Sequence, residues 1–459
     1  MTSTLDTITT SLKQMRKVVL ASFMGTALET YDLYLYGTAA ALIFAPLYFS
    51  NQEPALALVL SLLTFAVSFI ARPIGALVFG HFGDKIGRKR TLYVTLLLMG
   101  ISTALVGALP TYDMIGVAAP IILVLLRFLQ GIGFGGEYSG AVLMILEHAP
   151  AEKRGFYAGL NNAGPAVGFL ASSGIFLGMS LTMSDDAFLT WGWRIPFLFS
   201  LALVAVGLYL RMAIAESPVF EKARAIETKQ SKTQIPVVNV FRYYWRELLL
   251  ASGSFILIFA MFYLVSVHTL SYGVSNLGLS RDVLLIALML GVAIYGLAIP
   301  IFSNLSDRIG RKKILLIGVA LAAAWQFPFY WLLDTANIVL IGIAVTVELI
   351  IYAAIYGPAA AFVSELFGSK GRYTGSAVSY NIAGILGAAP APIVATLLVN
   401  ETGASWPIAL YMVAIAAISF FCILALPETR NRDLTADRSA APVSPGATAD
   451  GELAKETHR

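Results

Sequence analysis

Twelve long apolar segments run through the 459-residue chain and leave few folds open to it. Each is close to the roughly 20 residues that an α-helix needs to cross a bilayer. Only 13% of the residues are charged and 58% are hydrophobic, and a soluble protein of this size could not bury so much apolar surface. The sequence therefore predicts an all-α integral membrane protein with twelve transmembrane helices, at 18–44, 54–80, 91–109, 118–148, 156–180, 195–214, 248–274, 282–303, 314–333, 338–365, 374–399 and 407–426.

A short basic turn occurs twice, each time between two apolar segments. The copies span 80–90 and 304–313, and both contain the series Asp, basic residue, Ile, Gly, Arg, Lys. Asp84 and Asp307 are 223 positions apart, which is close to half of the chain. Repetition at such a spacing indicates two copies of one multi-helix unit, so we expect two pseudo-symmetric six-helix bundles.

Lys and Arg residues are distributed unevenly between the loops. If the N-terminus is inside, the loops on that side hold 27 of the 31 Lys and Arg residues. Loops rich in these residues face the cytoplasm, and an even number of helices places both termini there. Of the remaining four, Arg194 and Arg281 fall at outer boundaries, whereas Arg72 and Arg127 fall inside helices.

The polar stretches divide the chain into five parts. A segment rich in Lys, Glu and Gln separates the first six helices from the second six, and the tail is rich in Ala, Asp, Ser and Pro, which is typical of disorder. The predicted parts are a cytoplasmic N-terminus at 1–17, a first bundle at 18–214, a linker at 215–247, a second bundle at 248–426 and a disordered cytoplasmic tail at 427–459.

Glycine and proline residues mark two special places within the apolar segments. The glycines between 131 and 136 are expected to allow close packing of helices. Pro390 and Pro392 should bend or break the helix that contains them.

Several functions lack support in the sequence. Cys422 is the single cysteine and the four histidines are scattered, so the sequence offers no internal disulfide and no metal site. No nucleophile–base pair indicates an enzyme, and nothing indicates nucleic-acid binding or a soluble signalling domain. We therefore expect no enzymatic activity and no cofactor.

Charged residues inside the apolar segments are the strongest functional signals, because each is costly to place in a bilayer. Glu29 and Asp32 are three apart and share a helix face, and their mutual repulsion makes them candidates for binding a proton. Arg127 and Glu137 lie on another helix, where an arginine can hold a carboxylate with two parallel hydrogen bonds. The alternative is a purely structural ion pair among these four residues.

Polar residues elsewhere in the helices are candidate substrate ligands. Hydroxyl, amide and imidazole groups can bind hydroxyls or a carboxylate, but they also serve as hydrogen bonds between helices. Glu348 remains open between a second proton site and an ion-pair partner. The candidates are Tyr31, Tyr138, Asn161, Asn162, His268, Tyr352 and Asn381, together with Arg127.

The first basic turn matches a known family signature. The pattern Gly-x-x-x-Asp-basic-x-Gly-Arg-basic resembles the signature turn of the major facilitator superfamily, and every position of it is matched here, by Gly80, Asp84, Lys85, Gly87, Arg88 and Lys89. Ser303 replaces the glycine in the second copy. The runs 29–40, 131–138 and 191–197 are similar to the metabolite:proton symporter branch. Members of that branch carry shikimate, α-ketoglutarate, citrate, or proline and betaine.

The resemblance implies roles for several of these residues. Arg127-x-x-Gln130-Gly131 resembles the proton-coupling motif of the superfamily, and the basic turns resemble its latch on the cytoplasmic side. On this basis the predicted gating residues are Asp84, Arg88, Arg194, Asp307 and Arg311.

Together these observations predict a secondary active transporter of a bacterial inner membrane. We expect symport of a small organic acid, such as shikimate or a dicarboxylate, with the proton as coupling ion and a monomer in the lipid bilayer. The main alternative is proton-coupled uptake of a zwitterionic osmolyte such as proline or betaine. An exporter fits less well, because Phe169 stands where the antiporter pattern after Gly164-Pro165 would have a second glycine.

Overall fold

The computed structural model describes residues 12–86, 88–135, 138–212, 244–368 and 372–432. Every regular element within these residues is a helix. The predicted all-α membrane fold is therefore confirmed, and each of the twelve predicted segments coincides with one long helix or with two consecutive helices. Eight of these helical runs are long and apolar enough to cross a membrane, and the bent pair Asp185–Gly192 and Arg194–Tyr209 would make a ninth.

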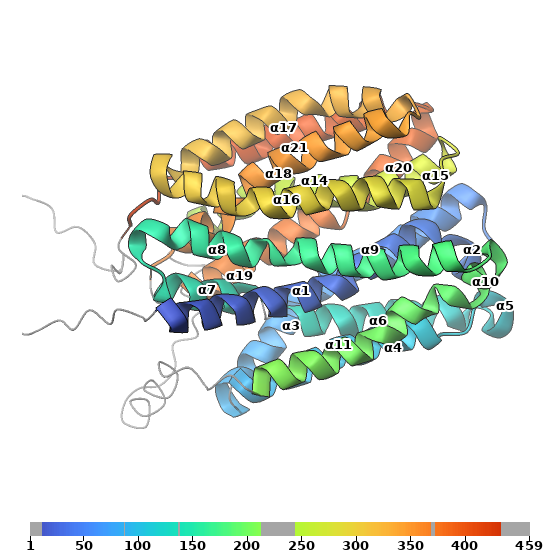
Figure 1. Ribbon diagram of the computed structural model, residues 1–459, viewed down its shortest axis with the longest axis horizontal. Helices are drawn as coiled ribbons and strands as arrows, with labels where there is room; N and C mark the ends of the chain where they lie inside the picture. Colours follow the sequence, from blue (N-terminus) through green and yellow to red (C-terminus); the bar gives the residue numbers. More distant parts are fainter. Residues whose placement is uncertain (1–11, 87, 136–137, 213–243, 369–371, 433–459) are drawn as a thin grey trace, which may run out of the picture.

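The first half of the chain forms one group of helices (Figure 1). Short elements connect the long ones: α2 (Phe44–Tyr48), α5 (Tyr112–Ile115) and α10 (Asp185–Ala187). The long helices are α1 (Leu12–Leu42), α3 (Pro54–Ile86), α4 (Arg88–Ala108), α6 (Ala118–Phe134) with α7 (Tyr138–His148), α8 (Arg154–Asn162) with α9 (Gly164–Thr182), and α11 (Arg194–Met212).

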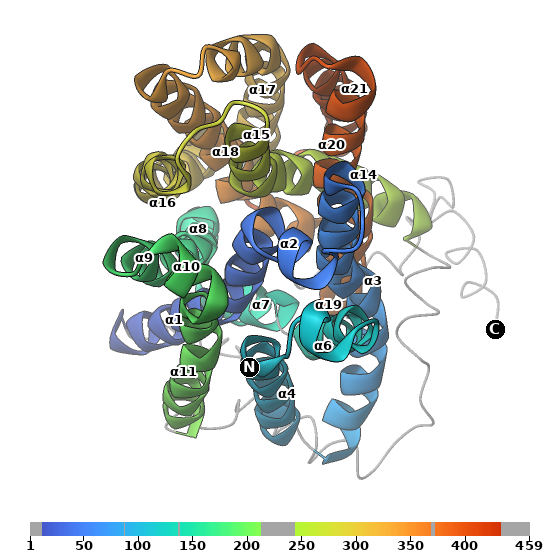
Figure 2. The ribbon, with the colours of Figure 1, turned by 90° about the vertical axis from the view of Figure 1, so that its right-hand side faces the viewer.

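The second half forms a second group, which Figure 2 shows end-on beside the first. Its helices are α14 (Trp245–Tyr263), α15 (Thr269–Ser275), α16 (Arg281–Ile309), α17 (Arg311–Asp334), α18 (Ile338–Leu366), α19 (Arg372–Ala383), α20 (Ala391–Thr402) and α21 (Trp406–Ala425). The groups meet where α16 packs on α8 and α9, where α18 packs on α8, and where α3 packs on α20.

Two segments differ from the predicted division of the chain. The linker predicted at 215–247 lies mostly outside the described residues, and α14 already begins at Trp245. The first residues of the predicted disordered tail are ordered, because Glu428 and Thr429 bond to helix ends. That part of the prediction is wrong: the polar composition there supplies hydrogen bonds to the second group.

A helix break near Pro390 was predicted and is confirmed. A π-helical turn, Gly384–Ala388, ends the regular part of α19, and α20 begins at Ala391. Proline removes a backbone donor and clashes with the preceding turn, which weakens the helical hydrogen bonds before Pro390. Helices α3, α16, α17 and α18 nevertheless continue through a single proline. A similar turn, Leu264–His268, joins α14 to α15 without any proline inside it.

Glycines let α6 and α3 approach each other closely. A Cβ atom built on Gly131 would lie 2.4 Å from the backbone oxygen of Ser68, and one on Gly135 would lie 2.0 Å from that of Arg72. Small residues serve this purpose between membrane helices. The glycine run is thus a packing surface, as predicted, and it fixes the position of Arg72 next to α6.

Candidate functional site

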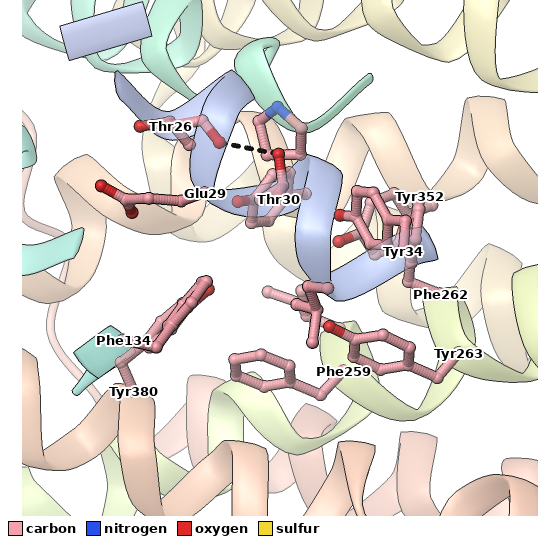
Figure 3. A pocket seen from close by; sticks show the side chains of 14 residues that line it. Thr26, Glu29, Thr30, Tyr34, Phe134, Phe259, Phe262, Tyr263, Tyr352 and Tyr380 are labelled. Carbon is pink, nitrogen blue, oxygen red and sulfur yellow. Dashed lines mark hydrogen bonds between the residues drawn. The ribbon is translucent and has the colours of Figure 1, made fainter. Parts of the chain in front are cut away.

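A narrow cavity lies between the two groups of helices. Figure 3 shows that aromatic rings and short polar side chains surround it. Its lining comes from six helices, α1, α6, α9, α14, α18 and α19: Thr26, Glu29, Thr30, Leu33, Tyr34, Phe134, Pro165, Ile258, Phe259, Phe262, Tyr263, Tyr352, Tyr356 and Tyr380.

Helix α1 supplies the polar wall of this cavity. Thr26, Glu29, Thr30 and Leu33 recur at the three- and four-residue spacing that places side chains on one helical face. The Thr30 hydroxyl donates to the backbone oxygen of Thr26 at 2.7 Å, and the Thr26 hydroxyl donates to Oδ1 of Asn161 at 3.1 Å. The threonines are thereby held in place, while Glu29 projects from the same wall.

A smaller cavity adjoins the first and shares Glu29, Leu33 and Phe134 with it. Most of its polar lining is charged: Glu29 and Asp32 come from α1, Arg72 from α3 and Arg127 from α6. Two carboxyl groups and two guanidinium groups therefore surround one space inside the helix bundle. The structure brings the predicted residues Glu29, Asp32 and Arg127 together.

Arg127 is only partly satisfied by hydrogen bonds. It is 1% exposed, its Nη1 donates to Oε1 of Gln130, and the amide of Gln130 donates to the Thr103 hydroxyl at 2.7 Å. The guanidinium carbon lies 4.0 Å from the ring centre of Tyr36, a cation–π contact. Nε and Nη2 have no hydrogen-bond partner among the described residues, so two strong donors are available for a ligand.

Arg72 has the same character. Its guanidinium carbon lies 4.1 Å from the ring centres of both Phe69 and Phe134, so the cation is held between two aromatic faces. It is 2% exposed, and its Nε and Nη2 lack partners within the described part of the chain. From the sequence, Arg72 was identified only as a charge inside a helix, although that position is itself a signal of function.

Aromatic contacts connect the two groups of helices around the cavity. The ring of Tyr34 on α1 lies 5.1 Å from that of Phe262 on α14, which in turn lies 5.3 Å from Tyr352 on α18. On the opposite wall, Tyr380 lies 4.8 Å from Phe259. Tyr352 was a predicted substrate ligand and does line the cavity, whereas Tyr34, Tyr263 and Tyr380 were not predicted.

Three predicted substrate ligands lie away from the cavity lining. The Tyr31 hydroxyl donates to the backbone oxygen of Pro196 at 2.9 Å, which turns it toward α11. The Asn381 amide donates to Ala377 one turn back on its own helix, so Tyr380, its neighbour in sequence, faces the cavity instead. The His268 ring stacks on Tyr272 at 5.6 Å. In this conformation none of the three is placed to bind a ligand there.

The two asparagines of α8 take part in contacts between helices. Asn162 donates to the backbone oxygen of Tyr356 on α18 at 2.9 Å and so joins the two groups. Asn161 accepts from Thr26, and its amide nitrogen has no partner among the described residues. The geometry supports the structural alternative for Asn162 and leaves Asn161 near the wall of the cavity.

Four predicted residues lie where the structure describes no side chain. Glu137 is outside the described residues altogether, and the side chains of Tyr138, Asp84 and Arg88 are not described. Their predicted roles stay predictions.

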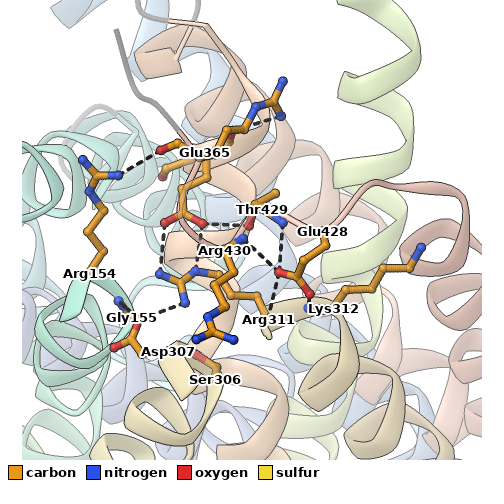
Figure 4. Close-up of polar contacts among 12 residues, drawn as sticks. Arg154, Gly155, Ser306, Asp307, Arg311, Lys312, Glu365, Glu428, Thr429 and Arg430 are labelled. Atoms are coloured by element: carbon orange, nitrogen blue, oxygen red, sulfur yellow. Dashed lines mark hydrogen bonds and ion pairs between the residues drawn. The ribbon is translucent and has the colours of Figure 1, made fainter. Parts of the chain in front are cut away.

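The second basic turn joins the two groups at one end of the bundle, which we call the Arg311 end (Figure 4). Asp307 accepts from the backbone N–H groups of Gly155 and Phe156 at 2.9 and 2.8 Å, at the start of α8. Nη1 of Arg311 lies 2.8 Å from Asp307 Oδ1, and its Nε lies 2.8 Å from Oε2 of Glu365. A carboxylate at a helix N-terminus is favourable, so Asp307 holds α8 against the second group.

Residues after α21 reinforce the Arg311 end. Glu428 accepts from the backbone N–H groups of Arg311 and Lys312 at 3.0 Å each, and the Thr429 hydroxyl donates to Glu365 at 2.7 Å. Figure 4 shows these contacts around the same carboxylates.

The opposite end also carries contacts between the groups, and we call it the Arg281 end. Nη2 of Arg281 donates to the Ser180 hydroxyl at 2.6 Å and lies 3.1 Å from Asp185. Ser180 also bonds to Asp282. Arg194 does not join the two groups. It donates to the backbone oxygens of Gly107 and Leu109 at 2.8 and 2.6 Å and so caps the end of α4 within the first group.

Comparisons with known proteins identify the family. A family model described as sugar (and other) transporter matches residues 17–438. The inner membrane metabolite transport protein YhjE of Escherichia coli (strain K12) is 39% identical, over 93% of this chain and 97% of that protein. The shikimate transporter of the same strain is 36% identical, over 93% of this chain and 97% of that protein. The proline/betaine transporter of that strain is 33% identical, over 96% of this chain and 88% of that protein.

A solved structure has the same fold. The partially occluded inward open conformation of the xylose transporter XylE from E. coli matches with a TM-score of 0.71 and 18% identity, over 90% of this chain and 98% of that one. The helical architecture, the matching family model and the transporters that resemble it along most of its length lead to one conclusion: this multi-pass membrane protein belongs to the sugar (and other) transporter family of the major facilitator superfamily.

Proposed function

We propose that the protein takes up a small organic acid, such as shikimate or a dicarboxylate, together with a proton. The observation that supports this most directly is the pair of buried guanidinium groups, Arg72 and Arg127, whose free N–H donors lie in the same small cavity as Glu29 and Asp32. A buried N–H donor without a hydrogen-bond acceptor is costly, and the carboxylate of an anionic substrate would supply the missing acceptor.

The chemistry of the walls fits a carboxylate on a small, partly apolar body. Guanidinium N–H groups bind carboxylates with two parallel hydrogen bonds. The rings of Phe134 and Phe259 can pack against the body of the substrate, while hydroxyls of Tyr34, Tyr263 and Tyr380 can donate to its oxygens.

Proton coupling follows from the mixture of charges. A proton bound by the acidic group of Asp32, Glu29 and Glu137 removes a negative charge next to Arg127, which then pairs with the substrate carboxylate. The two helix groups rock around the loaded site and release both ligands on the other side. The loops at the Arg311 end face the cytoplasm in this proposal, since they carry most Lys and Arg residues, and the protein acts as a monomer in the inner membrane.

A zwitterionic osmolyte is the second candidate. The resemblance to a proline/betaine transporter favours it, as does the aromatic cavity, because ring faces attract quaternary ammonium groups. Its carboxylate would occupy the same arginine donors, and its cation would face Tyr34 and Phe262.

Uptake into proteoliposomes tests the proposal. We expect shikimate or a dicarboxylate to accumulate when the pH outside is lower than inside, and Asp32→Asn to abolish that dependence while exchange of substrate across the membrane continues. Accumulation of betaine but of no organic acid would favour the second candidate. Accumulation that does not respond to an imposed pH gradient would rule out coupling to protons.

A further inference from the structure

We propose that Glu348 is a second proton-binding site, reached from the Arg281 end through a polar stripe on α17. It is separate from the acidic group around Asp32 and does not depend on which substrate the protein carries. The inference goes beyond the proposed function because it adds a titrating site in the second group of helices.

Glu348 is buried without a counter-ion. It is 2% exposed, its Oε1 accepts from the Gln326 amide at 2.9 Å, and its Oε2 has no partner among the described residues. The ion-pair alternative considered for Glu348 from sequence therefore has no cation to support it within the described chain. An ionised carboxylate in the bilayer interior is strongly disfavoured unless it is paired, and a bound proton removes that cost.

The surroundings of Glu348 are polar on one side only. From α17, Gln326 donates a hydrogen bond to it, and Tyr330 lies one turn further along the same face of that helix. The side toward α16 is apolar, because Gly291 packs against the neighbouring Val345 and Leu349. Both ring nitrogens of His268 lack hydrogen-bond partners among the described residues, so His268 does not bond to Glu348. The hydrogen bond to this carboxyl group comes from Gln326 of α17.

Three polar residues of α17 form a stripe from Glu348 to the surface. Gln326, Tyr330 and Asp334 recur every fourth residue and so lie on one face of the helix, spanning about 12 Å at 1.5 Å per residue. Asp334 is exposed at the Arg281 end, where it accepts from the Tyr272 hydroxyl at 2.8 Å and from the Ser405 hydroxyl at 2.5 Å. Tyr330 is buried and lies one turn from both Gln326 and Asp334, between the two ends of this stripe.

The same helix connects Glu348 to the central cavity. Tyr352 follows one helical turn later, lines the cavity, and packs against Phe262 and Tyr356. Binding or release of a proton at Glu348 would change the hydrogen bond between α18 and α17 one turn from this wall. A proton at Glu348 can therefore influence how α18 moves during transport.

Infrared spectroscopy of the purified full-length protein in lipid provides a direct test, because a protonated carboxyl group has its own C=O stretching band. We expect a pH titration of the unaltered protein to show a buried protonated carboxyl that Glu348→Gln removes and Asp32→Asn retains. Glu348→Asp should keep a titrating band at a shifted position, which guards against a folding defect in Glu348→Gln. Glu401→Gln, an exposed acid in the same group of helices, should leave the band unchanged.

Transport provides the second measurement. In proteoliposomes we expect Glu348→Gln to lower the number of protons carried per substrate molecule, while exchange of substrate continues. If Glu348→Gln leaves both the carboxyl bands and the proton ratio unchanged, Glu348 is a structural hydrogen-bond acceptor for Gln326 and the proposal is wrong. The infrared result remains valid even if substrate uptake proves not to be coupled to protons, so the two proposals fail independently.

Discussion

The guanidinium group of Arg127 has some N–H donors that are hydrogen-bonded and others that are available to a ligand. Gln130 and the Tyr36 ring hold one side, while Nε and Nη2 stay without partners among the described residues. We expect Arg127→Lys to lower uptake about 10- to 100-fold, because lysine keeps the charge but loses the planar fork, and a hydrogen bond to a charged group contributes about 1.5–3 kcal/mol. Initial uptake rates in proteoliposomes measure the loss.

Arg308→Lys is the matched control for that substitution. Arg308 is exposed at the last turn of α16, a helix that contributes no residue to the lining of either cavity. Substrate uptake by the Arg308→Lys variant should equal that of the unaltered protein. Full uptake by Arg127→Lys would contradict binding of a carboxylate by the fork.

Arg72 leads to a second prediction at this scale. Arg72→Leu removes a cation that is held between Phe69 and Phe134, and we expect at least a tenfold loss of affinity for an anionic substrate, as tenfold corresponds to about 1.4 kcal/mol. Ligand-induced shifts in thermal unfolding measure affinity without transport. Equal stabilisation of Arg72→Leu and the unaltered protein by the substrate would argue that Arg72 has only a packing role.

The sequence predicted part of this site and missed part of it, for identifiable reasons. Asp32 and Arg127 could be found because charge inside an apolar segment is rare. Tyr31 and Asn381 were misplaced because the rotation of a helix about its axis depends on its neighbours, which the sequence of one chain does not reveal. Tyr31 is next to Asp32 and Asn381 is next to Tyr380 in the sequence, and Asp32 and Tyr380 do line the cavities.

The close contact between α3 and α6 positions both arginines at once. We expect Gly131→Ala to lower the stability by about 1–3 kcal/mol, the usual cost of overpacking, because the new methyl group would lie 2.4 Å from the Ser68 backbone oxygen. Thermal unfolding of the purified protein measures the change. Gly178→Ala on α9 is the control, since a Cβ atom at that position would meet nothing within 4 Å. It should be at least as stable as the unaltered protein, because alanine favours a helix over glycine.

Helices were easier to predict than their interruptions. The apolar segments predicted the long helices, because a segment inside a bilayer must satisfy its backbone N–H and C=O groups by its own hydrogen bonds. Pro390 indicated the break before α20. The turn at Leu264–His268 contains no glycine or proline, so no local signal indicated it. This turn packs against α1 and α20, and contacts between distant segments cannot be seen in a single sequence.

Contacts between the two groups occur at both ends of the molecule and around the cavity in the middle. At the Arg311 end Asp307 holds the start of α8, and at the Arg281 end Arg281 holds the end of α9 through Ser180. The duplicated basic turn indicated the first set from sequence. The second set could not be predicted, because Ser180 and Arg281 belong to different halves and to no repeated motif. In the proposed rocking mechanism these two sets of contacts open alternately.

Substitution at each end should therefore shift the molecule in opposite directions. Arg311→Gln removes the guanidinium that holds Asp307 in place within the second group, and breaking a buried ion pair costs about 3–5 kcal/mol. We therefore expect Asp307 to release the start of α8 and the Arg311 end to open. Arg281→Gln should open the other end. Hydrogen–deuterium exchange reports both, because the N–H groups of Gly155 and Phe156 are bonded to Asp307 and exchange faster once α8 is released.

The expected pattern is reciprocal. Arg311→Gln should speed exchange at the start of α8 and leave the end of α9 protected, whereas Arg281→Gln should speed exchange around Ser180 and leave α8 protected. Lys313→Gln removes an exposed charge from the same basic turn as Arg311 and should change neither region. If Arg311→Gln loosens both ends together, the contacts stabilise the fold as a whole and do not act as alternating gates, because a two-state change can only favour one end at the expense of the other.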